Sequence, residues 1–173
     1  MTHGSEKASA SADRRPALAK LGRPKLHRVA PRERLFERLD DLRQRPIVWI
    51  SGPPGAGKTT LTASYVASRR IAATWYQLDR ADADPGTFFY YLARSRAPSR
   101  SRTRTELPPF TPEYMADLGA FSRRFFRELF ARLPAASCLV LDNFQEVESA
   151  RTFQAVFSEA LDAVPEGRNV FVL

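Results

Sequence analysis

Short apolar runs alternate along this chain with longer segments in which apolar residues recur every three or four positions. The short runs have the length and composition of strands buried in a parallel sheet, and they cover residues 46–51, 71–79, 137–143 and 169–173. The helical spacing predicts helices at 59–68, 84–92, 111–133 and 149–164. This alternation predicts an α/β fold, in which a parallel sheet carries helices on both faces.

A further helix is expected before the first strand, within residues 25–45, because Leu35, Leu39 and Leu42 lie on one helical face. The start signals of three later helices are Asp84 before Pro85, Thr111 before Pro112, and Ser149. The helix at 111–133 carries an aromatic stripe formed by Phe121, Phe125, Phe126 and Phe130. We interpret this stripe as core packing rather than as a cofactor site.

The composition fits one folded domain. A chain of 173 residues with 43% apolar content is long enough to bury a sizeable core. Its one cysteine, Cys138, lies in an apolar run and is expected to be a small buried residue. Because one cysteine cannot form an intrachain disulfide, a cytoplasmic location fits best. No run of 18 apolar residues is present, so we expect no membrane span.

The net charge of +8 is concentrated in two segments. Residues 1–45 carry 12 basic and 6 acidic side chains, and residues 94–106 carry 5 arginines and 1 acid. We expect residues 1–24 to be a disordered basic tail and residues 94–110 to be an arginine-rich loop within a domain at 25–173. A basic tail can bind nucleic acid without sequence specificity, although a solvated tail is the simpler interpretation.

A complete phosphate-binding pattern, G-x-x-x-x-G-K-[ST], lies between the first predicted strand and the helix at 59–68. Its residues are Gly52, Pro53, Pro54, Gly55, Ala56, Gly57, Lys58 and Thr59. The glycines let successive backbone N–H groups point at phosphate oxygens. Lys58 reaches the β- and γ-phosphates, and the Thr59 hydroxyl can ligate Mg²⁺. The pattern predicts a site for ATP or ADP at the carboxyl end of the first strand.

A second motif, Leu139-Val140-Leu141-Asp142, is typical of a Walker B element, a hydrophobic strand that delivers an aspartate toward Mg²⁺. The next residue, which often orients the attacking water, is Asn143 and cannot act as a base. Glu146 can take that role through a water molecule, or it can simply face solvent. The predicted activity is therefore at most a slow Mg²⁺-dependent ATPase, with Lys58, Asp142 and Glu146 as its catalytic candidates.

Four segments together resemble the nucleotide-binding domain of STAND-class signalling ATPases, an AAA-like P-loop NTPase class, and in particular that of bacterial transcription activators of the MalT and LuxR type. They are 29–35 with its Arg-Glu pair, the phosphate loop, the run Trp75-Tyr76-Gln77-Leu78-Asp79, and 139–144. The resemblance implies a switch that holds ADP at rest, exchanges it for ATP on a signal and then self-associates. It also implies slow turnover.

By position, the resemblance implies that Val29 and Arg32 lie near the adenine and that Thr59 and Asp142 serve Mg²⁺. The positions that would cradle the phosphates are Gly52, Pro53, Pro54, Gly55, Ala56, Gly57, Lys58, Thr59 and Thr60. The fourth strand is expected between the first and the third. We expect a P-loop NTPase-type domain truncated after that strand, marginally stable and with an open sheet edge beside the first strand. DNA would be contacted only through a C-terminal domain that this chain lacks.

Two other functions remain open from the residues. A small-molecule or nucleotide kinase shares the phosphate loop and would use arginines between Arg94 and Arg104 as a lid. A nucleic-acid-binding ATPase would use the basic tail, and its binding would fall steeply with salt concentration.

Overall fold

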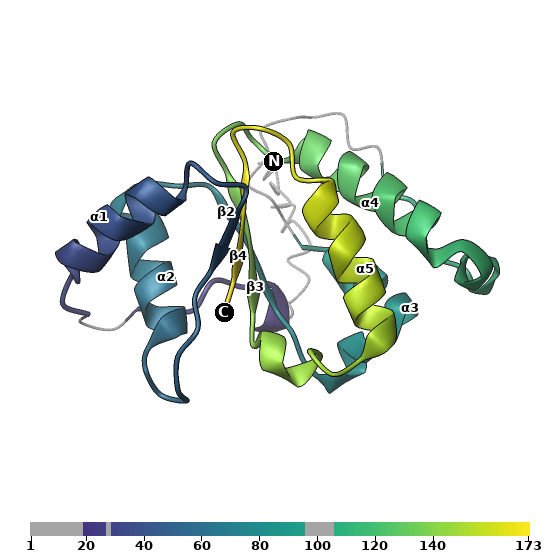
Figure 1. Cartoon of the computed structure of the whole chain (residues 1–173), viewed down its shortest axis with the longest axis horizontal. Helices are drawn as coiled ribbons and strands as arrows, with labels where there is room; N and C mark the ends of the chain where they lie inside the picture. The colour runs from purple at the N-terminus through teal and green to yellow at the C-terminus, as the bar shows by residue number, and fades with distance from the viewer. Residues whose placement is uncertain (1–18, 27–28, 96–105) are drawn as a thin grey trace, which may run out of the picture.

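Four short strands form one parallel sheet at the centre of the protein (Figure 1). They are β1 (Ile47–Trp49), β2 (Ala73–Gln77), β3 (Cys138–Asp142) and β4 (Asn169–Val172). Their order across the sheet is β1-β4-β3-β2, which confirms that the fourth strand lies between the first and the third. The computed structural model describes residues 19–26, 29–95 and 106–173.

Helices cover both faces of this sheet, as predicted (Figure 1). One face is covered by α1 (Glu33–Leu42) and α2 (Lys58–Ser68). The other face is covered by α3 (Pro85–Leu92), α4 (Leu118–Arg132) and α5 (Arg151–Asp162). Neighbouring residues of a strand point to opposite faces, so Trp75 of β2 packs on the side of α1 and α2 while Tyr76 packs on the other.

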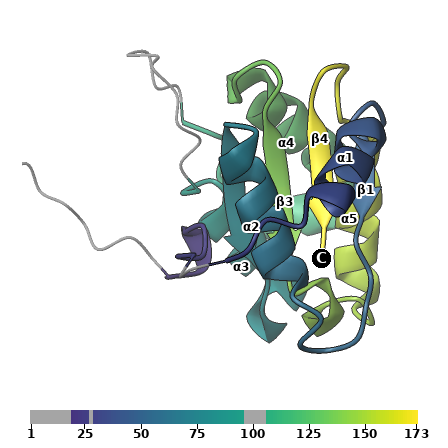
Figure 2. The same cartoon turned by 90° about the vertical axis from the view of Figure 1, so that its left-hand side faces the viewer.

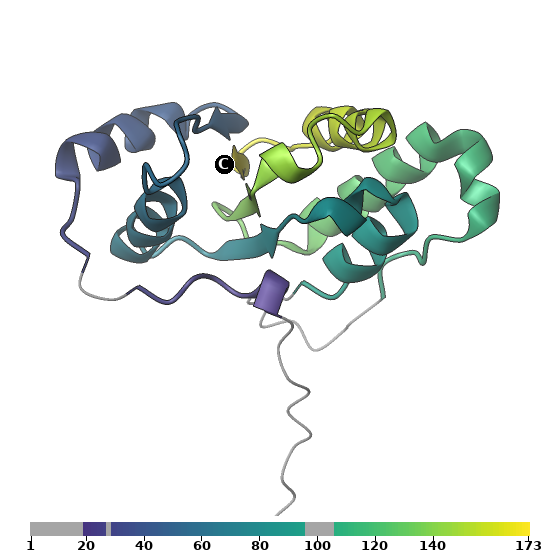
Figure 3. The same ribbon diagram turned by 90° about the horizontal axis from the view of Figure 1, so that it is seen from below.

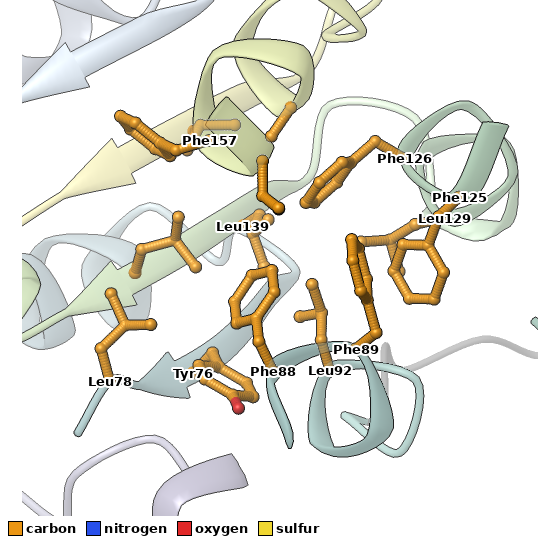
Figure 4. Packing of buried hydrophobic residues seen from close by; sticks show 14 of the residues in the cluster. Tyr76, Leu78, Phe88, Phe89, Leu92, Phe125, Phe126, Leu129, Leu139 and Phe157 are labelled. Carbon is orange, nitrogen blue, oxygen red and sulfur yellow. The ribbon is translucent and has the colours of Figure 1, made fainter. Parts of the chain in front are cut away.

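The larger half of the core is built from aromatic rings of α3, α4 and α5, and Figure 4 shows them packed against β2 and β3. The Phe89 ring lies 4.9 Å from the Phe121 ring and 4.8 Å from the Phe125 ring, measured between centroids. All three side chains are at least 96% buried. Ring pairs at this spacing add to the free energy gained from burial alone, so the predicted aromatic stripe is confirmed as core packing.

The starts of the helices differ from the prediction in several places. Asp84 does cap α3, and its carboxylate accepts a hydrogen bond of 2.7 Å from the Thr87 N–H. Thr111 instead precedes a 3₁₀-helix, η3 (Pro112–Asp117), and α4 begins only where Asp117 accepts from the Ala120 N–H at 3.1 Å. The prediction of one continuous helix over 111–133 was wrong because a second, stronger capping residue lies inside it.

Two other helices are shorter than expected. The lead-in helix α1 begins at Glu33 with Arg32 as its N-cap, and Pro31 keeps a helix from running through Ala30, because proline restricts the residue before it to extended conformations. In α5 the N-cap position is occupied by Ala150 and not by Ser149. Phe36 and Leu39 of α1 and Phe153 of α5 are buried, whereas Leu42, expected on the buried face of the lead-in helix, is 36% exposed.

The segments outside the sheet are described only in part. Residues 96–105 of the arginine-rich loop and residues 1–18 of the predicted tail lie outside the described residues. The short 3₁₀-helix η1 (Ala19–Leu21) packs beside β2, and Leu21 contacts the aromatic core. Within the described ranges, none of the helices has the length and apolar character needed to cross a membrane.

Candidate nucleotide site

The carboxyl ends of the strands bring the two predicted motifs together. The loop that joins β1 to α2 carries the phosphate-binding pattern, and Asp142 is the last residue of β3. Figure 2 shows this loop at the lower edge of the molecule, below the carboxyl end of β4. Ligands of open parallel sheets bind at this end, so the topology favours the site predicted from the sequence.

The phosphate loop has the backbone shape that its glycines permit. Gly55 and Gly57 have φ angles of 77° and 81°, in the left-handed region that residues with a Cβ rarely adopt. α2 begins at Lys58, directly after Gly57, so the first N–H groups of an eleven-residue helix face the loop. The Lys58 ammonium donates a 3.0 Å hydrogen bond to the Gly52 carbonyl across the loop. Backbone donors and a lysine ammonium thus converge where phosphate oxygens would bind.

Thr59 and Asp142 are joined by a hydrogen bond of 2.9 Å from the hydroxyl to Oδ1. The same carboxylate oxygen accepts the Asn143 N–H at 3.1 Å. Asp142 is only 2% exposed, and its other oxygen, Oδ2, has no hydrogen-bond partner among the described residues. Burial raises the pKa of Asp142, while the hydrogen bonds from Thr59 and Asn143 act in the opposite direction.

This arrangement fits a magnesium ion shared with a nucleotide. Mg²⁺ takes oxygen ligands and is commonly held by one or two carboxylates together with substrate phosphates and water. The pair offers a hydroxyl oxygen and a buried carboxylate oxygen that lacks a protein partner. In the described part of the chain, no group of three or more His, Cys, Asp or Glu side chains is suited to hold a metal without help from a ligand.

Trp75 is a residue of this site that the sequence motifs did not assign. Its side chain is 2% exposed, and its indole N–H lacks a hydrogen-bond partner within the described ranges. Burial is the largest effect on the pKa of Asp142, and it raises this pKa. The hydrogen bonds from Thr59 and Asn143 lower it, and the Trp75 indole lowers it by a smaller amount. The available signal was strand alternation, because Trp75 lies two residues before Gln77, the register partner of Asp142.

Arg32 lies against the phosphate loop. Its guanidinium donates a long hydrogen bond of 3.5 Å to the Ala56 carbonyl, and Nη2 lies 3.5 Å from the position that a Cβ on Gly57 would occupy. The start of α1 positions this side chain, because Arg32 is the N-cap residue of that helix. Val29 is half-buried in the segment before α1. The placement of Val29 and Arg32 near an adenine stays a prediction.

Glu146 is directed toward a different neighbour. It ends the short 3₁₀-helix η4 (Phe144–Glu146), and its carboxylate forms an exposed ion pair of 3.3 Å with Arg80. Arg80 belongs to η2 (Arg80–Ala83), which follows β2. Asn143, beside Asp142, has a φ of 63°, a left-handed conformation that asparagine tolerates better than most residues. The catalytic role predicted for Glu146 therefore remains a prediction.

The sheet order, the phosphate loop after β1 and the aspartate that ends β3 define a P-loop NTPase core. The chain belongs to the Nephrocystin 3, N-terminal family, whose sequence profile matches residues 32–173. Membership of a P-loop NTPase family implies nucleotide binding.

Bacterial transcriptional regulators are similar to the chain over most of its length. The chain is 30% identical over 141 residues to the HTH-type transcriptional regulator MalT of Cronobacter sakazakii, and 28% identical over 144 residues to MalT of Vibrio cholerae. Each match covers 80% of this chain and 15% of the regulator. The predicted resemblance to MalT-type proteins is thereby confirmed, and the chain spans about 15% of the length of these relatives.

Proposed function

We propose that this domain is a signalling switch that binds ATP and ADP and hydrolyses ATP slowly. The observation that carries the proposal is the Thr59–Asp142 hydrogen bond directly beside the phosphate loop. A strand–turn–helix of this kind has no structural need for a buried carboxylate with one unpaired oxygen. Thr59 and Asp142 would hold a Mg²⁺ ion, whose positive charge would balance the buried carboxylate and the phosphates.

Each residue of the loop then has a defined task. The N–H groups between Gly55 and Thr60 would hold the phosphate oxygens, and the ammonium of Lys58 would leave the Gly52 carbonyl to contact the β- and γ-phosphates. Thr59 and Asp142 would hold Mg²⁺, which supplies positive charge against the phosphates. Arg32 would contact the nucleotide from its position beside Ala56 of the loop.

The proposal of slow turnover rests on the residue after Asp142. An asparagine side chain cannot accept the proton of an attacking water, and Glu146 pairs with Arg80. Such a site would hold ATP for long periods, as a switch requires. The state would then change by exchange of ADP for ATP, and self-association of the ATP form would carry the signal.

The names of the relatives suggest where such a switch acts. MalT is described as an HTH-type transcriptional regulator, and this chain matches 15% of its length. We propose that this chain is the nucleotide-dependent switch of a regulator of this kind, and that other parts of such a regulator contact DNA. A cytoplasmic location follows from that role.

Nucleotide titration of the full chain tests the proposal. Isothermal titration calorimetry with ATP and ADP, with and without Mg²⁺, is expected to show saturable binding to wild type and binding at least tenfold weaker to Lys58→Ala, because an ion-paired phosphate contact contributes more than about 1.4 kcal/mol. Lys25→Ala is the matched control, since Lys25 is an exposed lysine outside the loop. Absence of binding to wild type at every Mg²⁺ concentration would refute the switch.

A further outcome would favour the kinase instead. Transfer of the γ-phosphate to any member of a panel of small-molecule and nucleotide acceptors, at a rate above that of ATP hydrolysis, would contradict a switch. The proposed function predicts no transfer.

A further inference from the structure

A second cluster of polar side chains lies outside the nucleotide site, where β2 ends and η2 begins. Its central group is the Lys20 ammonium, which lies 2.9 Å from Asp79 Oδ2 and 2.9 Å from Asp82 Oδ2. Lys20 is separated from these aspartates by 59 and 62 positions in the sequence. The contact therefore joins the segment before the domain to the outer strand of the sheet.

Two aromatic rings complete the surroundings of this ammonium. Its nitrogen lies 5.1 Å from the centre of the Tyr76 ring and 4.8 Å from that of the Tyr91 ring. A cation at this distance from a ring face is attracted by the negative face of the π system. Two carboxylates and two ring faces thus surround one positive charge, and the Lys20 side chain keeps only 15% of its surface exposed.

The site is held in shape by hydrogen bonds that do not involve Lys20. Asp82 is fully buried, and it accepts the Tyr76 hydroxyl at 2.6 Å and the Asp79 N–H at 2.8 Å. Asp79 in turn accepts the Ala81 N–H at 3.0 Å. The hydrogen bond from Lys20 holds the pKa of Asp79 below its usual range, against the opposing effect of burial. Each carboxylate therefore has hydrogen-bond donors besides Lys20.

We propose that Tyr76, Asp79, Asp82 and Tyr91 form a binding site for a primary ammonium, and that its resident ligand is Lys20 of the same chain. We call these four residues the ammonium site. Tyr76 lies in β2, and Asp79 and Asp82 follow it by a few positions, so the site would hold the segment that carries Lys20 against the outer strand.

The ammonium site lies at the outer edge of the sheet, where it would fasten η1 beside β2. In the described part of the chain, β2 pairs on one side only, with β3, and η1 lies beside its other side (Figure 3). An outer strand with free N–H and C=O groups invites pairing with another chain. Lys20 holds η1 over this edge, and release of the lysine would uncover it.

Two residues of the ammonium site, Asp79 and Tyr91, border a hollow that is open to solvent. An open hollow of about 710 Å³ lies beside the ammonium, and its lining includes Lys20, Asp79, Asp84, Tyr90 and Tyr91. A soluble amine can therefore enter if the lysine is shortened. Lys20→Ala removes three methylenes and the ammonium, which together correspond to n-propylammonium.

Hydrogen–deuterium exchange of the full chain without nucleotide tests the proposal. Lys20→Met keeps the length of the stem and removes the charge, and it is expected to speed exchange in residues 19–26 and in β2 on the order of tenfold. Lys25→Met is the matched control and should leave exchange unchanged, because Lys25 is exposed. Unchanged exchange in Lys20→Met would overturn the proposal.

Chemical rescue tests the identity of the ligand. In Lys20→Ala, n-propylammonium is expected to restore slow exchange in β2, and n-propanol at the same concentration is not. Failure of the amine, or equal rescue by the alcohol, would overturn an ammonium site. Nucleotide affinity is measured in parallel, so failure here is distinguishable from failure of the proposed switch.

Discussion

Replacing Asp142 by asparagine should make the protein more stable and at the same time remove its response to magnesium. Asp142 is 2% exposed, and burial raises the pKa of its carboxyl. The charged form is therefore disfavoured in the folded state relative to the unfolded chain. This cost is absent below the unfolded pKa, near 3.9, and it grows as the pH rises through the raised folded pKa. It is complete only above the folded pKa.

The structure sets the size of the expected gain. Oδ2 of Asp142 has no hydrogen-bond partner among the residues that the structure describes, and a buried polar atom left unpaired costs about 1–3 kcal/mol. An amide keeps one unpaired atom but removes the charge, so we expect the free energy of unfolding to rise by about 1–2 kcal/mol. In a chain of this size, each kcal/mol raises the melting temperature by about 2–4 °C.

Urea denaturation at pH 7, with and without saturating ATP and Mg²⁺, measures both effects. At a ligand concentration one hundred times Kd, wild type should gain about 2.7 kcal/mol from binding. Asp142→Asn should gain much less, and the same amount with or without Mg²⁺, because a neutral amide is a poor ligand for this ion. Asp162→Asn, at an exposed position near the end of α5, is the control and should stay within about 0.5 kcal/mol of wild type.

Two results would refute this reasoning. A loss of 1 kcal/mol or more in Asp142→Asn without nucleotide would mean that the carboxylate stabilises the empty site. An undiminished Mg²⁺-dependent gain on ATP binding would mean that Asp142 is not a ligand of the ion.

Two further predictions follow from other parts of the structure. Tyr65 is fully buried, and its pKa is raised to about 12, first by burial and then by its hydrogen bond to Asp40. Its contribution to the free energy of unfolding is therefore complete below pH 10 and is lost as the pH rises through about 12. In pH-dependent urea denaturation over this range, Tyr65→Phe should lose roughly 3 kcal/mol less than wild type, whereas Tyr114→Phe, at an exposed tyrosine, should lose as much as wild type. Gly57→Ala should lower the free energy of unfolding by about 1–2 kcal/mol, because the φ of 81° is strained for any residue with a Cβ. Gly52→Ala, which needs no positive φ, should lose less than half as much by the same measurement, and equal losses would contradict the backbone argument.

The nucleotide site could be predicted from the sequence because its parts lie at strand ends. The phosphate loop and Asp142 each follow an apolar run, and parallel strands place their carboxyl ends at one edge of a sheet. The 2.9 Å contact between Thr59 and Asp142 follows almost directly from that topology. The order β1-β4-β3-β2 was anticipated from the family resemblance rather than from periodicity.

Other features depend on tertiary contacts that no local pattern specifies. The start of α4 required a choice between Thr111 and Asp117, both good capping residues, and in the structure only the Asp117 side chain accepts a capping hydrogen bond. The contact of Lys20 with Asp79 and Asp82 spans about 60 positions and depends on the turn geometry of η2. The face of the sheet on which the Trp75 side chain lies depends on the register of β2, and a register shift of one residue would place it on the opposite face.

The burial of Trp75 has a practical consequence. The chain holds two tryptophans, Trp49, which is 52% exposed on β1, and Trp75, which is 2% exposed near Asp142. A solvated indole emits at longer wavelengths than one enclosed in a core, so the two residues contribute separable parts of the emission spectrum. A variant with phenylalanine at position 49 would leave a single fluorophore beside the candidate magnesium ligand. The protein thus contains its own optical probe, and each change at its nucleotide site can be followed without a label.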